Sequence, residues 1–385
     1  MKRQLLGVAA FMLALSAHAQ DNPLWMRYCA ISPDGTSIAF TYKGDIYTVP
    51  VNGGKAAQIT TNAAHDTHPV WSPDGKQIAF ASDRMGSMDI FVVDREGGIP
   101  KRLTTHSGNE TPVAFKDADH ILFLANVMPS AEDAQFPSGQ FQQVYEVSTT
   151  GDRPVMFSSM PMEDISINKT GNALLYHDKK GYEDPWRKHH TSSITRDIWL
   201  CSLDGKRSYR KLTSFNGEDR TPVWASDGKS FYYLSEEKGS FNVFKRALDG
   251  TSSTQLTHHT KHPVRFLTAA DNGTLCYGYD GEIYTMKEGT EPRKVQISIL
   301  TDKNDKDLIR QIRRNGATEI ALSPDAKEVA FILRGDVYVT SVEYKTTKQI
   351  TNTPEQERDI NFAPDGRSIV YASERNGLWQ IYQAS

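Results

Sequence analysis

Ser32-Pro33-Asp34-Gly35 is the stretch that decides the fold, because near-copies of it recur as Ser72-Pro73-Asp74-Gly75, Ser323-Pro324-Asp325-Ala326 and Ala363-Pro364-Asp365-Gly366. Neighbouring copies lie about 40 residues apart, a period that is typical of stacked blades or solenoid turns. Proline suits the second position of a type I turn, aspartate the third, and glycine accepts the left-handed conformation that follows. Each copy therefore predicts the corner of a β-hairpin.

Strand patterns follow each corner. An apolar run such as Ile38-Ala39-Phe40 or Ile78-Ala79-Phe80 predicts a buried strand. The next strand begins with an acidic residue and has an aromatic residue two places later, as in Asp45-Ile46-Tyr47, and the last strand ends in a pattern such as Gln58-Ile59-Thr60. Four short strands per unit without helical periodicity predict an all-β fold, a β-propeller of four-stranded blades.

The repeat units also predict the domains. We expect a six-bladed β-propeller at residues 21–300, a charged linker at 301–318, and the first two blades of a second, incomplete β-propeller at 319–385. The linker prediction rests on the alternating charges between Asp302 and Arg314. One eight-bladed propeller is the alternative, in which residues 24–28 return to supply the outer strand that the last unit lacks. The unfinished last unit favours a chain that is the front of a longer polypeptide.

Residues 1–20 have the pattern of a secretory signal peptide. Lys2 and Arg3 precede an apolar stretch at residues 5–15, which is too short to span a bilayer, and Ala17-His18-Ala19 forms a cleavage site. We therefore expect export to a bacterial periplasm, without a membrane anchor. Loss of Lys2 and Arg3 changes the formal net charge from −3 to −5, which argues against nucleic acid as a partner.

The sequence lacks the motifs of covalent catalysis. It contains no nucleophile elbow, zinc-protease helix, Cys-x-x-Cys pair or phosphate-binding loop. We therefore predict no catalytic residue, no metal site and no cofactor, and we interpret His258 and His262 as loop residues rather than metal ligands. Cys29, Cys201 and Cys276 are predicted to be buried thiols.

One loop departs from the repeat. In the fourth unit, residues 179–193 mix aromatic, basic and hydrogen-bonding groups, and long ordered loops in compact folds often carry binding. Trp186, Arg187, His189 and His190 are the candidate substrate-binding residues, because cations can bind a peptide carboxylate while a ring packs on the peptide. The alternative is a flap that covers the propeller mouth or packs on a neighbouring domain.

Several of these motifs together resemble the N-terminal part of a tricorn-type protease. They are the repeated corners, Gly44-Asp45-Ile46-Tyr47, Ser82-Asp83-Arg84, and the fourth-unit loop leading to Arg196-Asp197-Ile198-Trp199. In that family a six-bladed propeller precedes a seven-bladed one, a PDZ-like module and a serine-peptidase core. The propellers route unfolded peptides to that core, and the assembly is oligomeric.

The resemblance implies a non-catalytic propeller part of an exported peptidase. Its partners would be peptides or unfolded polypeptide, a C-terminal peptidase core and further copies of the chain. The family's catalytic residues lie beyond Ser385 and are carried over to no residue here. A free-standing periplasmic propeller that binds a protein partner, as TolB-like proteins do, is the alternative, since those proteins use similar repeats.

Overall fold

The computed structural model describes residues 23–126, 141–182, 184, 186, 191–300 and 313–385. Strands dominate this part of the chain, and its one helix is the short 3-10 helix η3 (Arg375–Gly377). The chain divides into two compact units, Met1–Asp302 (unit 1) and Lys303–Ser385 (unit 2). Within the described ranges, no helix has the length and apolar character needed to cross a membrane. The prediction of an all-β fold is confirmed.

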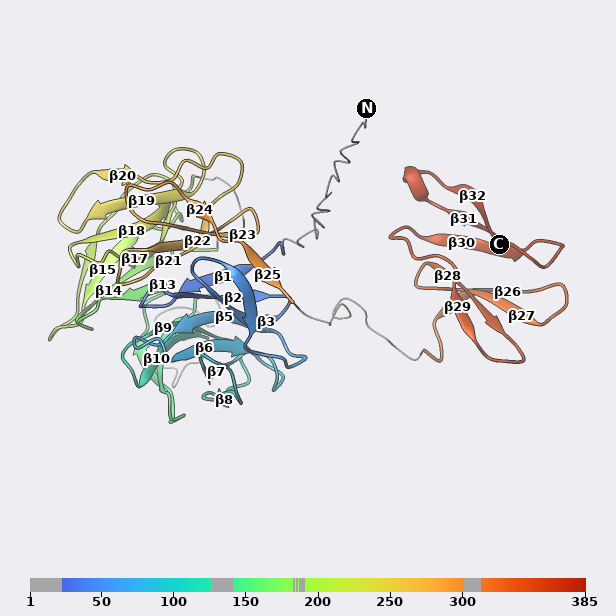
Figure 1. The fold of residues 1–385 in the computed structure, drawn as a ribbon, viewed down its shortest axis with the longest axis horizontal. Coiled ribbons are helices and arrows are strands. Elements are labelled where there is room, and N and C mark those ends of the chain that lie inside the picture. The colour runs from blue at the N-terminus through green and yellow to red at the C-terminus, as the bar shows by residue number, and fades with distance from the viewer. Residues whose placement is uncertain (1–22, 127–140, 183, 185, 187–190, 301–312) are drawn as a thin grey trace, which may run out of the picture. The chain divides into compact units, whose positions relative to one another are not determined.

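The described part of unit 1 contains six sheets, which are antiparallel except for one added strand and are numbered in chain order (Figure 1). Sheet 1 consists of β1 (Arg27–Ile31), β2 (Ser37–Tyr42), β3 (Asp45–Pro50) and β4 (Gly54–Gln58), with β25 (Ile297–Ile299) added at its edge. Sheets 2 and 3 consist of β5 (Asp66–Trp71), β6 (Gln77–Ser82), β7 (Asp89–Asp94) and β8 (Lys101–Arg102), and of β9 (Glu110–Phe115), β10 (His120–Ala125), β11 (Gln143–Ser148) and β12 (Val155–Ser158).

The remaining sheets of unit 1 repeat the pattern. Sheet 4 consists of β13 (Met162–Ile167), β14 (Ala173–Asp178), β15 (Ile198–Ser202) and β16 (Ser208–Lys211). Sheet 5 consists of β17 (Asp219–Trp224), β18 (Ser230–Ser235), β19 (Asn242–Ala247) and β20 (Ser253–Gln255). Sheet 6 consists of β21 (Arg265–Ala269), β22 (Leu275–Tyr279), β23 (Glu282–Met286) and β24 (Arg293–Lys294).

Unit 2 contains two more sheets. Sheet 7 consists of β26 (Ala317–Leu322), β27 (Glu328–Leu333), β28 (Asp336–Ser341) and β29 (Thr347–Gln349). Sheet 8 consists of β30 (Glu357–Phe362), β31 (Ile369–Ser373) and β32 (Gln380–Ala384). Residues 317–318 of the predicted linker thus belong to β26, and residues 301–312 of it lie outside the described residues.

The first strands of the sheets in unit 1 contact one another in a closed cycle. Each of β1, β5, β9, β13 and β17 contacts the first strand of the next sheet, and β21 contacts β1. A hydrophobic cluster fills each of the six junctions between neighbouring sheets. The sheets therefore surround a common axis with their first strands innermost, which is the arrangement of a β-propeller.

The repeated sequence motifs have clear structural roles. At the corners, Gly35 N–H donates to the Ser32 carbonyl at 2.8 Å, and Gly35 has a φ of +72°, as the predicted turn requires. At the end of the outer strand, a threonine hydroxyl accepts a hydrogen bond from a buried backbone N–H of the neighbouring strand. The pairs, at 2.8–2.9 Å, are Thr60 with Ile46, Thr104 with Ile90, Thr213 with Ile198, Thr257 with Val243 and Thr351 with Val337.

The predicted buried strands and thiols are also confirmed. Ile38 and Phe40 of β2 and Ile78 and Phe80 of β6 are fully buried, because these strands lie inside their sheets and pack on a neighbouring sheet. Cys29, Cys201 and Cys276 are buried and free.

The ring of unit 1 is tied at its seam by β25. This strand follows sheet 6 in the chain but pairs in parallel with β4 of sheet 1, with Ile297 opposite Gly54 and Ile299 opposite Ala56. Gly54 N–H also donates to the Gln296 carbonyl at 2.8 Å. The last segment of unit 1 is therefore hydrogen-bonded to its first sheet.

Candidate functional site

Trp186 lies in the long loop between β14 and β15 of sheet 4. Its indole ring contacts the ring of Phe266 edge-on, with the centroids 6.2 Å apart. The guanidinium carbons of Arg27 and Arg265 lie 4.7 Å and 4.9 Å from the centroid of the indole. Arg27 lies 5.8 Å from a second indole, that of Trp25. Two cations and three aromatic rings thus gather at one place, which we call the Trp186 cluster.

Three separate sheets build the Trp186 cluster. Arg27 and Arg265 are the first residues of β1 and β21, the two inner strands that meet at the seam between sheets 1 and 6. The loop of sheet 4 reaches them, because Arg265 donates from Nη2 to the carbonyl oxygen of Trp186 at 2.8 Å. Ring closure therefore brings together residues that are far apart in the sequence.

The charge of the cluster is predominantly positive. The pKa of Arg265 is lowered to about 10, chiefly by burial and also by the nearby guanidinium groups of Arg220 and Arg27, against the opposing effects of Asp184 and Glu218. At neutral pH Arg265 still carries its charge. In the described ranges, no carboxylate lies within 4.0 Å of the Arg27 guanidinium. An anionic ligand would relieve this excess of positive charge.

The neighbouring basic side chains of sheet 4, by contrast, are paired with carboxylates. Lys179 Nζ lies 2.7 Å from Glu163, His177 Nε2 lies 3.2 Å from the same carboxylate, and Arg196 Nη1 lies 2.9 Å from Glu218. Burial raises the pKa of Glu163, but the hydrogen bond from His177 and the charges of Arg196 and Lys179 outweigh burial and hold it well below its usual range. The basic groups and carboxylates of this network neutralise one another. The network therefore stabilises the junction between sheets 4 and 5 and leaves no unpaired charge for a ligand.

The structure describes one of the four substrate-binding residues that were predicted from the sequence. Trp186 lies at the centre of the cluster, whereas Arg187, His189 and His190 lie outside the described residues. Sequence reasoning missed Arg27 and Arg265. Each of them directly precedes a residue of positive φ in an inner strand, Tyr28 after Arg27 and Phe266 after Arg265. Aligning the inner strands of the repeats with one another would have shown an arginine at the same position in both strands.

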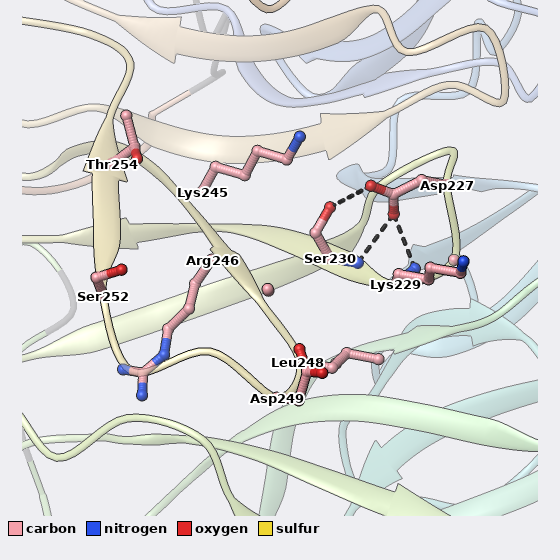
Figure 2. A pocket seen from close by; sticks show the side chains of 11 residues that line it. Asp227, Lys229, Ser230, Lys245, Arg246, Leu248, Asp249, Ser252 and Thr254 are labelled. Atoms are coloured by element: carbon pink, nitrogen blue, oxygen red, sulfur yellow. Dashed lines mark hydrogen bonds between the residues drawn. The ribbon is translucent and has the colours of Figure 1, made fainter.

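A concave region lies on sheet 5, where a hollow of about 540 Å³ is lined by residues of the turns around Asp227 and Asp249 (Figure 2). The Asp227 carboxylate accepts from the backbone N–H of Lys229 and from Ser230, and Lys245 Nζ lies 2.7 Å from Glu288. These groups are engaged in turns and ion pairs. Among the described side chains, no group of three His, Cys, Asp or Glu residues could hold a metal ion. The Trp186 cluster is therefore the candidate site.

Comparisons with known proteins agree on one family. The family model "Tricorn protease N-terminal beta propeller domain" matches residues 23–292. "Tricorn protease homolog 1" of Streptomyces coelicolor is 24% identical over 363 residues, which cover 92% of this chain and 32% of that protein. "Tricorn protease" of Thermoplasma acidophilum is 25% identical over 332 residues, which cover 83% of this chain and 29% of that protein.

A solved structure shows the same fold. The "Crystal structure of the tricorn protease" superposes with a TM-score of 0.66 at 18% identity, covering 91% of this chain and 33% of that one. The chain thus spans about a third of the length of these relatives.

Proposed function

The chain belongs to the tricorn protease N-terminal β-propeller family, and from this we propose that it is the non-catalytic, peptide-binding part of an exported tricorn-like serine peptidase. In this proposal, unit 1 is a six-bladed propeller that gates and routes unfolded peptides to a catalytic core outside this chain. Residues 1–20 direct export to the periplasm, and further copies of the chain assemble with it.

The Trp186 cluster is the observation that carries peptide binding. The Arg27 guanidinium lies close to the indole rings of Trp25 and Trp186, and the guanidinium of Arg265 lies close to that of Trp186. A guanidinium binds a carboxylate through two parallel charge-assisted hydrogen bonds, and aromatic rings pack on the side chain next to it. At a free peptide C-terminus, the carboxylate and the side chain of the last residue lie next to each other, so the cluster could bind both.

Exposed apolar side chains in unit 2 support the proposal that this unit is part of a second propeller. Ile320 and Leu322 of β26 are 73% and 64% exposed, and Ile381 of β32 is 81% exposed, whereas every sheet junction of unit 1 is filled by apolar side chains. Within the described residues, sheet 8 has three strands where the other sheets have at least four. Further blades of the same repeat would cover these faces and pair with the strand edge.

The experiment is a binding assay with a labelled, unstructured peptide that has either a free or an amidated C-terminus. We expect Arg27→Ala to weaken binding of the free-carboxylate peptide by about tenfold, or about 1.4 kcal/mol. Amidation should weaken binding to the wild type similarly, and it should have little further effect on Arg27→Ala. Arg293→Ala is the matched control, because Arg293 is an exposed arginine of β24 in the same unit.

Equal affinity of the wild type and Arg27→Ala would contradict the proposed site. If the wild-type chain bound no peptide but bound a folded envelope protein, the result would favour the alternative of a TolB-like, free-standing binding propeller.

A further inference from the structure

Two of the three cysteines lie together at the seam of unit 1. Cys29 is in β1 of sheet 1 and Cys276 is in β22 of sheet 6, and both belong to the hydrophobic cluster that fills the junction between these sheets. The two residues are 2% and 0% exposed. Cys201 is also buried, but it belongs to the cluster between sheets 3 and 4. The ring therefore places one pair of thiols together and keeps the third apart.

Hydrogen bonds hold the two thiols in contact. The Cys276 thiol is hydrogen-bonded to that of Cys29, whose Sγ donates to the carbonyl oxygen of Phe266 at 3.5 Å. The backbone is fixed at the same point, because the N–H of Ile31 donates to Thr268 Oγ1 at 3.1 Å. Thr268 in turn pairs with Cys276 across β21 and β22. A disulfide forms only where two backbones approach closely, and β1 and β22 are in direct contact.

We propose that Cys29 and Cys276 are an oxidisable pair, and that a disulfide between them joins sheets 1 and 6 covalently when the chain folds in an oxidising compartment. The oxidant is itself a disulfide, of a small thiol compound or of a protein. One cysteine thiolate attacks the S–S bond of the oxidant, and a mixed disulfide forms as one oxidant thiolate leaves. The second cysteine thiolate attacks the mixed disulfide and releases the other oxidant thiolate. The chain thus loses two protons and two electrons, which convert the oxidant into two thiols.

Burial determines when this bond can form. Burial raises the pKa of Cys276 well above its usual range, and the hydrogen bond with Cys29 adds to this effect. A thiol reacts with a disulfide as its thiolate, so the folded, reduced pair is protected from oxidants. The same packing shields a finished disulfide from reductants. The bond therefore forms while sheets 1 and 6 come together, and it then persists in the folded ring.

The choice of partner separates oxidation guided by the fold from random oxidation. Cys29 and Cys276 are 247 positions apart, whereas Cys201 and Cys276 are 75 positions apart. In an unfolded chain the shorter loop closes more readily, because the entropy cost of closure grows with loop length. Random oxidation therefore favours a link between Cys201 and Cys276. A link between Cys29 and Cys276 requires the closed ring to bring sheet 6 to sheet 1.

The test is refolding of the full chain in a buffer of reduced and oxidised glutathione, which depends neither on the proposed export nor on peptide binding. Free thiols are then alkylated, and the chain is digested without reductant for mass spectrometry. We expect a linked peptide that contains Cys29 and Cys276, and an alkylated Cys201. Oxidation of the chain in urea is the control, and it should give mainly the link between Cys201 and Cys276. Alkylated Cys29 and Cys276 in the refolded protein, or the same link as in urea, would overturn the proposal.

A second measurement tests whether the disulfide secures the seam. Wild-type protein refolded with glutathione is compared in urea with wild-type protein refolded and kept in a reductant. We expect the disulfide to raise the urea midpoint of unit 1 by about 1 M or more, because it constrains the unfolded chain. Cys201→Ser should keep this difference, and Cys29→Ser should abolish it. Equal midpoints of the oxidised and reduced wild type would show that no bond joins the two sheets.

Discussion

Glu110 begins β9 with its carboxyl group buried beside a second carboxylate. It is 2% exposed, and Asp89, which pairs with Arg102 at 2.8 Å, lies close enough to repel it. The pKa of Glu110 is raised to about 7, chiefly by burial; the charge of Asp89 adds to this effect, and a hydrogen bond from Thr104 and the charge of Arg102 oppose it. Glu110 is therefore protonated in the folded protein at a pH at which the unfolded chain has already ionised it.

Glu110→Gln should remove part of the pH dependence of stability. As pH rises through 7, the folded wild type must charge a buried group, so this group lowers the free energy of unfolding by about 1 kcal/mol between about pH 6 and pH 8.5. Asp219, whose pKa burial also raises to about 7, acts in the same direction and remains in the variant. Urea unfolding at both pH values would measure the difference. If the free energy of unfolding depended on pH equally in the wild type and in Glu110→Gln, the raised pKa would not belong to Glu110.

The sequence predicted only part of the candidate site, for reasons that are visible at single residues. Trp186 was predicted because its loop interrupts a repeat, which is a local signal. Arg27 and Arg265 were missed because their proximity depends on closure of the ring between β21 and β1. The sequences of β1 and β21, each taken alone, contain no signal that the two strands are neighbours in the fold.

At the scale of elements, five of the described sheets are held at the outer edge by a threonine hydroxyl. Thr60, just beyond the end of β4, is 3% exposed and accepts from the N–H of the fully buried Ile46 at 2.9 Å. The same arrangement recurs in other sheets of both units. The recurring Ile-Thr or Leu-Thr ending is therefore a hydrogen-bonding requirement of the sheet.

Thr60→Val should destabilise unit 1 by about 1–3 kcal/mol, because it leaves a buried N–H without an acceptor while keeping the side-chain shape. Thr60→Ser keeps the hydroxyl and should lose less stability. The free energies of unfolding of both variants, measured in urea, test this expectation. A loss that is as large for serine as for valine would assign the effect to packing of the methyl group instead.

The parallel pairing of β25 with β4 depends on a close backbone approach at Gly53. Gly53 has a φ of +88°, and a Cβ atom there would collide with the carbonyl oxygen of Gln296. The adjacent Gly54 also has a positive φ, but a Cβ atom there would meet no atom within 4 Å. An alanine at position 54 would therefore introduce backbone strain alone, whereas an alanine at position 53 would introduce the same kind of strain and a collision with the backbone of Gln296.

Gly53→Ala should open the seam of unit 1, whereas Gly54→Ala should add strain alone. We expect Gly53→Ala to cost about 1–3 kcal/mol more than Gly54→Ala and to speed amide hydrogen exchange in β25 and β4. Hydrogen exchange with mass spectrometry measures both regions. Unchanged exchange in β25 of Gly53→Ala would show that the close approach is not needed for pairing.

The elements themselves were largely predictable from the sequence, and β25 was the exception. Corners such as Ser32-Pro33-Asp34-Gly35 and alternating apolar residues are local signals, so they identified the hairpins. Ile297–Ile299 is a short strand that pairs in parallel with a distant segment. Such pairing leaves no turn or periodicity in the adjacent sequence, so it requires the fold to be known.

At the scale of the whole molecule, the two units differ in how completely they bury their apolar surface. The ring of unit 1 has a filled junction between every pair of neighbouring sheets, including the seam. Within its described residues, unit 2 has one such junction, between sheets 7 and 8, and its strands β26 and β32 expose Ile320 and Ile381. The two units should therefore differ in stability.

We expect two unfolding transitions in calorimetry, of which the lower belongs to unit 2. A protein limited to residues 21–300 should keep the higher transition and lose the lower one, because unit 1 has its own closed core. Binding of a hydrophobic dye should fall in the same shortened protein. One transition that shifts as a whole when residues 301–385 are removed would mean that the units stabilise each other.

The pairing of β25 with β4 also affects the order in which the protein folds. Ile297 must reach Gly54, so the ring cannot close until nearly the whole of unit 1 has been synthesised. Earlier hairpins form from contacts that are near in sequence, but this last pairing carries the entropy cost of closing a loop that spans most of the unit. Closure of the seam is thus expected to be the slow step of folding, and until it occurs the edges of sheets 1 and 6 are open to binding by a chaperone or by another nascent chain.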